Sequence, residues 1–246
     1  MVATKKKTTR KNPEACCGHC AVPRAEKYCR TEKGRGPADC PSICHKKMAQ
    51  KALADTPPQE LEFARQAAIQ ECAGYNRGGS YADLTPIKPR IVEIVEFGKR
   101  MGYAKLGLIF CGGLMQESSI VQEILETNDF TVVSAMCKAG RIPKSAYGLT
   151  REQHLDVTSK AETACNPKFQ ALLVNKAKVD FNILLGLCVG HDSLAIRHLR
   201  APVTVLAVKD RLLGNNPLAA IYMYDGYYRY LKKPQVPQDL KNPSGA

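Results

Sequence analysis

The sequence lacks any long apolar run, and this absence limits the classes of protein to which it can belong. Its 246 residues are 44% hydrophobic and 24% charged. No stretch approaches the ~20 consecutive apolar residues that a membrane-spanning helix needs. The lysine-rich start also lacks the apolar core and small-residue cleavage site of a secretory signal. We therefore expect no membrane span and a cytoplasmic location.

Nucleotide-binding motifs are also absent. No GxGxxG or GxxxxGK[ST] run occurs, and Cys111-Gly112-Gly113 alone is too short to predict a phosphate loop. The net charge of +13 is concentrated at the N-terminus, where residues 1–57 hold 13 Lys and Arg against 5 Asp and Glu. A basic arm of this kind is most often a solvated tail, and no recognition motif or aromatic stacking surface accompanies it. We do not expect nucleic-acid binding.

Cysteine, in contrast, is abundant, with eleven in the chain. The cytoplasm keeps thiols reduced, so this number indicates metal binding or catalysis rather than disulfides. Turn residues and cysteines dominate residues 16–45, which show no periodic apolar pattern, so we expect a metal rather than a core to order them. The predicted organisation is a disordered basic arm (1–15), a cysteine-rich metal-binding module (16–57), an α/β domain (58–233) and a flexible tail (234–246).

The module contains one Cys-x2-Cys pair, Cys17 and Cys20, which lets two thiolates grip one metal. Cys29 and Cys40 complete a four-sulfur set. The irregular spacing and the Cys-Pro final ligand favour a [4Fe–4S] cluster over zinc, but a zinc ion that only orders the N-terminus stays open. Cys16 and Cys44 are spare donors, so the exact ligand set stays open too.

The rest of the chain alternates short apolar strands with amphipathic helices. The pattern predicts strands at 105–110, 130–136, 181–187 and 203–208, and helices at 58–73, 87–101, 114–125, 167–178 and 192–199. This alternation predicts an α/β fold with a mostly parallel sheet of about four strands and flanking helices. On the first of these helices, Cys72 falls among apolar positions and is expected to be packed.

Four further cysteines come at the ends of these elements. Cys111, Cys137 and Cys188 end three of the strands, and Cys165 precedes the N-cap of a helix. Since parallel strands end at one edge and the next helices start there, the four thiols are expected to meet. We predict a second metal cluster or redox site there, although each cysteine alone would be ordinary core packing. Lys209 and Arg211 follow the fourth strand and either bind an anion, balance cluster charge or are plain surface charges.

Several segments of the chain resemble a known family. The run CNPKFQALLVNKAKVDFNILLGLCVGHDSLAIRHLRAPVTVLAVKDRLLGNNPLAAIY (165–222) resembles the end of an uncharacterised family of predicted metal-binding proteins, domain of unknown function 1847. The FCGGL and MCKAG segments and the N-terminal cysteines are similar too, so the likeness covers most of residues 16–222. The resemblance implies metal binding and no particular reaction. It matches both predicted cysteine sets to the family pattern, whereas residues 1–15, Cys16 and Cys44 depart from it.

Three functions follow as hypotheses. The first is an iron–sulfur redox protein in which the N-terminal [4Fe–4S] cluster exchanges electrons with a second centre and a redox partner protein. The second is a zinc-binding protein or enzyme with a structural N-terminal zinc and an edge site for a small-molecule substrate, where Cys137 does chemistry beside three metal-bound thiolates. The third is a metal-ordered interaction module on an α/β scaffold.

Overall fold

The computed structural model describes residues 15–76, 78–235 and 237, and the chain divides into two compact units, Met1–Arg65 and Gln66–Ala246. The predicted basic arm (1–15) and tail (234–246) lie almost entirely outside the described residues. Within the described part, no helix is both long and apolar enough to cross a membrane.

The first unit consists of short elements. These are the 3-10 turns η1 (Cys17–His19) and η2 (Arg24–Glu26), the helices α1 (Pro41–Cys44) and α2 (Lys46–Ala54), and the start of α3 (Pro58–Ala73). None of residues 15–65 is buried. Folding of a small unit depends on burying apolar surface, and the described residues of this unit form no hydrophobic core.

The second unit is built on a four-stranded parallel sheet, which confirms the predicted fold class. Its strands are β3 (Lys105–Phe110), β4 (Thr131–Met136), β5 (Phe181–Leu185) and β6 (Val203–Ala207), in the spatial order β4-β3-β5-β6. All five residues of β5 are buried, as expected for a central strand that is covered on both faces.

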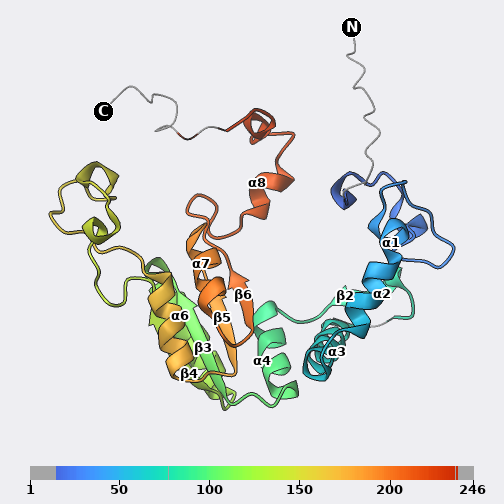
Figure 1. Ribbon diagram of the computed structural model, residues 1–246, viewed down its shortest axis with the longest axis horizontal. Helices are drawn as coiled ribbons and strands as arrows, with labels where there is room; N and C mark the ends of the chain where they lie inside the picture. Colours follow the sequence, from blue (N-terminus) through green and yellow to red (C-terminus); the bar gives the residue numbers. More distant parts are fainter. Residues whose placement is uncertain (1–14, 77, 236, 238–246) are drawn as a thin grey trace, which may run out of the picture. The chain divides into compact units, whose positions relative to one another are not determined.

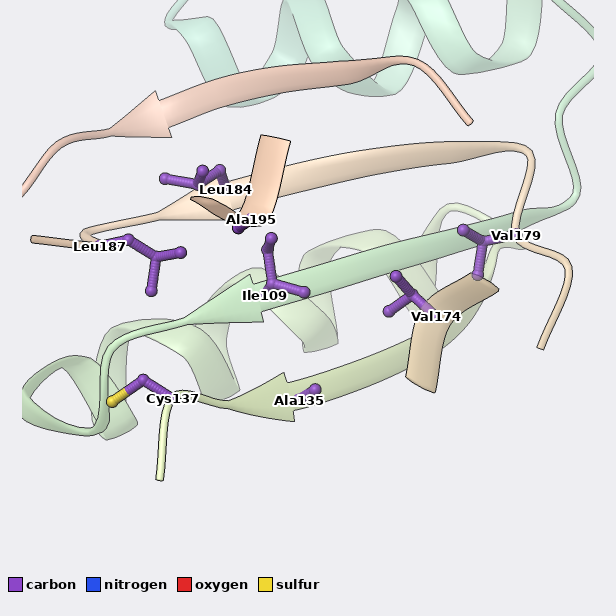
Figure 2. Packing of buried hydrophobic residues seen from close by; sticks show 8 residues of the cluster. All are labelled: Ile109, Ala135, Cys137, Val174, Val179, Leu184, Leu187 and Ala195. Atoms are coloured by element: carbon purple, nitrogen blue, oxygen red, sulfur yellow. The ribbon is translucent and has the colours of Figure 1, made fainter. Parts of the chain in front are cut away.

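Helices cover both faces of this sheet. Figure 1 shows α6 (Pro167–Lys176) and α7 (His191–His198) together on one face. There, Val174 of α6 and Ala195 of α7 belong to one buried cluster with Ile109 of β3 (Figure 2). On the other face, Phe97 of α4 (Arg90–Arg100) packs its ring against Phe181 of β5. The remaining elements are β1 (Tyr75–Asn76), η3 (Tyr81–Asp83), β2 (Thr85–Pro86), η4 (Gly112–Leu114), α5 (Met115–Thr127), η5 (Lys144–Tyr147), η6 (Arg151–Gln153), α8 (Leu218–Tyr222) and η7 (Arg229–Lys232).

The order of the strands creates a switch point between β3 and β5. From β3 the chain passes through α5 to β4 on one side, and then through α6 to β5 on the other side. The two connections therefore leave the sheet in opposite directions. In open parallel sheets, ligands bind in the crevice at the carboxyl ends of the strands where this reversal occurs.

The expectation that Cys72 is packed was wrong, because its side chain is exposed. In α3 the buried residue is the polar Gln70, whose side-chain amide donates to Glu96 Oε2 at 2.7 Å and accepts from Arg100 Nε at 2.9 Å. This end of α3 is therefore fastened by polar contacts rather than by the apolar positions that the spacing indicated.

Gly186, the residue after β5, should tolerate no side chain. Its φ of +66° disfavours any Cβ, and a Cβ there would overlap the buried Leu114 side chain. Gly102 has an almost identical φ of +67° but open space around it. We predict that Gly186→Ala lowers the free energy of unfolding by about 1–3 kcal/mol more than Gly102→Ala does, the excess being the steric cost alone. Urea denaturation of both variants measures this difference. Equal losses of unfolding free energy would show that the Leu114 side chain moves aside without steric cost.

Candidate functional site

The four cysteines predicted to meet lie where the sequence placed them relative to the strands. Cys111 follows β3 directly, Cys137 follows β4 directly, and Cys188 lies three residues beyond the end of β5. Cys165 precedes Asn166, whose side chain caps α6 by accepting from the Phe169 N–H at 3.0 Å. These four cysteines at the carboxyl edge of the sheet are called the thiol rim below.

Two sulfurs of the thiol rim are in contact. The Cys165 thiol donates to Cys137 Sγ at an Sγ–Sγ distance of 3.7 Å, although the two residues are 28 positions apart. Figure 2 shows the Cys137 side chain just beyond the end of β4, with its sulfur toward the turn that follows β3. From that turn, the Gly112 N–H donates to Cys137 Sγ at 3.3 Å.

The backbone brings this pair together where the long loop 138–164, called the excursion below, closes at its base. Residues 138–164 leave the sheet after Cys137 and return at Cys165. An antiparallel bridge joins Pro143 and Thr163 near the base. At the very end, the Asn166 N–H donates to the Cys137 carbonyl at 2.7 Å. The two cysteines are thus held by main-chain bonds and not only by packing of their side chains.

A carboxylate fastens the interior of the same excursion. Glu162, with only 10% of its side chain exposed, accepts from Lys144 Nζ at 3.1 Å and from the Leu155 N–H at 2.7 Å. Lys138 Nζ lies 3.9 Å from its other oxygen. Because Lys138 follows Cys137, this network also places a positive charge beside the buried sulfur.

The contact between the two thiols changes their protonation. The thiol proton of Cys165 hydrogen-bonds Cys137, and with the Gly112 N–H, the Cys111 thiol and the Lys138 charge it lowers the pKa of Cys137 to about 5, against the opposing effect of burial. The same contact, together with burial and the negative charge of the neighbouring sulfurs, raises the pKa of Cys165. The pair therefore holds one proton near neutral pH.

Cys111 and Cys188 complete the thiol rim and lie beside two cations. Both sulfurs are close enough to Cys165 that their negative charge contributes to its raised pKa. Arg211 Nη2 donates to Cys188 Sγ at 2.9 Å. Lys209 Nζ and Cys111 Sγ lie 3.3 and 3.9 Å from the point where a Gly113 Cβ would sit. In the described part of the chain, neither Lys209 nor Arg211 makes an ion pair with a carboxylate.

The donor chemistry of the thiol rim suits a thiophilic metal, because thiolates prefer zinc and iron–sulfur centres. With Zn–S bonds of about 2.3 Å, two ligands of a tetrahedron are about 3.8 Å apart. The 3.7 Å between Cys137 and Cys165 matches that edge. Among residues 15–76, 78–235 and 237, however, no group of three or more Cys, His, Asp or Glu side chains is arranged around one metal position. The structure thus provides two ligands at ligand spacing and two more sulfurs nearby.

Gln170, which was not predicted as a site residue, joins two of the strands that end in cysteine. Gln170 on α6 is fully buried, and its Nε2 donates to the carbonyls of Phe110 at 3.0 Å and Ala135 at 2.7 Å. Its Oε1 is buried and has no protein partner among the described residues. The signal was present in the sequence, since Gln170 lies on the same helical face as Val174, four residues on.

The cysteines of the N-terminal unit are less closely associated. Cys17 begins η1 and Cys20 is the C-cap that follows it, with the Cys20 N–H donating to the Cys17 carbonyl at 3.2 Å. Cys29 lies in an exposed loop and Cys40 is the N-cap of α1. Within this described unit, no hydrogen bond joins any two of these four sulfurs; Cys44 Sγ instead donates to the Cys40 carbonyl at 2.8 Å.

The fold and the site together define a parallel α/β protein with a thiol-lined edge at its switch point. The chain belongs to the family described as "Protein of unknown function (DUF1847)", whose model matches residues 40–206. It is also similar to the uncharacterised protein MJ0455 of Methanocaldococcus jannaschii, with 36% identity over 191 residues that cover 77% of this chain and 89% of the relative. The family match includes Cys40 and the whole thiol rim, whereas Cys17, Cys20 and Cys29 precede it.

The lowered pKa of Cys137 predicts a thiolate that persists well below neutral pH. In reduced, chelator-treated protein, the ultraviolet absorbance of one thiolate should disappear as the pH falls through about 5, whereas an ordinary thiol is protonated already at neutral pH. Removing the donor with Cys165→Ala should move this midpoint upward, and Cys72→Ser, on an exposed cysteine, should leave it unchanged. A parent titration with no thiolate at pH 7 would contradict the arrangement.

Proposed function

We propose that this protein is a cysteine-ligated metalloprotein whose principal centre is held by the thiol rim. The observation that carries the proposal is the 3.7 Å contact between Cys137 and Cys165 at the switch point, with Cys111 and Cys188 at the same edge of the sheet. Separate parts of the chain supply them, so local sequence alone does not explain their proximity. Packing of four unrelated cysteines would not require the main-chain hydrogen bond from Asn166 to the Cys137 carbonyl, which places Cys165 beside Cys137.

Charge supports a metal at this position. Four thiolates around a divalent ion, or around a cluster core of the same charge, leave a net charge of about −2, which is costly to hold at a partly buried edge. Lys209 and Arg211 are two cations beside the thiol rim without carboxylate partners in the described residues. They would offset that charge, and the N–H of Arg211 already donates to one of the sulfurs.

The first candidate for the chemistry is electron transfer through iron–sulfur clusters. In this reading the thiol rim holds one cluster, and Cys17, Cys20, Cys29 and Cys40 hold a [4Fe–4S]-type cluster in the N-terminal unit. The absence of any buried residue in 15–65 supports a metal there, because small units without a core fold around metals. Such a protein would act in the reducing cytoplasm with a redox partner protein.

Zinc is the second candidate, and the 3.7 Å between Cys137 and Cys165 favours it. This spacing is that of two sulfurs on one tetrahedral ion. A zinc site with three protein ligands keeps one position open, where zinc polarises a bound substrate or water. The protein would then bind or act on a small molecule, with Arg211 and Lys209 beside the open position.

Metal and sulfide analysis of anaerobically purified, full-length protein tests the proposal. We expect stoichiometric iron and acid-labile sulfide with a broad visible absorbance; a colourless protein with stoichiometric zinc would select the zinc candidate instead. Replacing any cysteine of the thiol rim with serine should remove the metal of that centre, and Cys72→Ser should remove none. Protein that holds neither metal after anaerobic purification would contradict the proposal.

The N-terminal centre is tested separately with Cys17→Ser and Cys20→Ser in the full chain. Each should lower the metal content by one centre while the thiol rim keeps its own. Because no core holds residues 15–65, loss of the metal should also increase proteolysis within this unit. Unchanged metal content in both variants would show that this unit is ordered by other means.

A further inference from the structure

The contact between Cys137 and Cys165 has a consequence for the metal-free protein. Their sulfurs are 3.7 Å apart, and a disulfide bond is about 2.05 Å long, so bond formation requires a closure of about 1.7 Å. That distance is on the scale of a side-chain rotation. The main chain already holds the two residues together through the Asn166 N–H and the Cys137 carbonyl at 2.7 Å.

We propose that Cys137 and Cys165 form a reversible disulfide in the metal-free protein by reaction with low-molecular-weight disulfides, and that this bond prevents metal from loading at the thiol rim. Formation of the disulfide depends on the geometry of the two cysteines alone. The blocking of metal rests on the proposed function, because it requires that the thiol rim binds metal.

Exposure decides the order of the two exchange steps. Cys137 is only 3% exposed, whereas Cys165 is half-buried, so a reagent R–S–S–R reaches Cys165 first. Cys165 passes its proton to Cys137 and attacks one reagent sulfur as a thiolate; the reagent S–S bond breaks, and the first R–S⁻ takes that proton and leaves as R–SH. Cys137, again a thiolate, then attacks Cys165 Sγ from within the protein, and the second R–S⁻ leaves and takes its proton from water. Two electrons and the single proton of the pair pass from the protein to the reagent.

Oxidation would remove two of the four thiolates and, with them, the matched tetrahedral edge. The two remaining sulfurs, those of Cys111 and Cys188, are too few for a structural zinc site or a cubane cluster, which take four ligands. Cys188 is also held by the Arg211 guanidinium at 2.9 Å. A reducing environment would therefore be needed both to prepare the thiol rim for metal and to recover it after oxidation.

The test uses full-length protein that has been reduced, treated with a chelator and incubated anaerobically with bis(2-hydroxyethyl) disulfide. Trypsin cuts this sequence into peptides 106–138, with Cys111 and Cys137, and 161–168, with Cys165 alone. We expect these two peptides to be joined, with a mass two hydrogens below their sum, and to separate after treatment with dithiothreitol. The link should persist in Cys111→Ser and disappear in Cys137→Ser. A missing link, or one that depends on Cys111, overturns the inference.

Metal uptake tests the blocking of metal in the same samples. Reduced protein and Cys72→Ser should take up zinc at the thiol rim, while disulfide-linked protein should bind one metal fewer until it is reduced again. Circular dichroism of the linked and reduced forms confirms that both are folded. Undiminished uptake by linked protein overturns the blocking of metal. A link that forms in a protein unable to bind any metal overturns the proposed function and the blocking of metal, and leaves the disulfide standing.

Discussion

The pairing of β3 with β4 on one side and with β5 on the other is the constraint on which the candidate site depends. All three pairings with neighbours in the sheet are parallel, so the carboxyl ends of the strands share one edge. Because β3 lies between β4 and β5, the connections after β3 and β4 run in opposite directions. The thiol rim lies at the edge where these connections diverge. If one of these pairs were antiparallel, a cysteine would be carried to the opposite edge.

The sheet alone would bring the cysteines near each other but not into contact. Three further devices act at the carboxyl edge, each with a distinct physical basis. Gln170 ties the ends of β3 and β4 with two hydrogen bonds from the buried side of α6. The base of the 138–164 excursion clamps Cys165 to Cys137 through the backbone, and the positive φ of Gly186 turns the chain closely past Leu114. Together they fix the positions of the strand ends and of Cys137 and Cys165 at this edge, which the parallel sheet alone would not do.

The two units of the protein are ordered by different physical means. The sheet of the second unit is stabilised by buried aliphatic side chains, several of them with no exposed surface. The first unit buries none of residues 15–65. This contrast explains why apolar periodicity predicted the strands and helices from residue 58 onward to within a few residues, while in residues 16–45 only the turns and the cysteine spacing were informative. Under the proposed function, a metal would take the place of a hydrophobic core in residues 15–65, whereas the second unit is ordered without one.

The sequence by itself determined the α/β class, the four strands, the Asn166 cap and the positions of Cys111, Cys137, Cys165 and Cys188 at element ends. These features depend on residues that are neighbours in the chain, whose periodicity and capping preferences are local. Only the tertiary structure decided that Cys137 touches Cys165, that Arg211 rather than another cation holds Cys188, and that Gln170 joins two strands. Each of those contacts spans more than 20 residues. The exposure of Cys72 was likewise a tertiary outcome, because an apolar helical position is buried only if another part of the fold covers it.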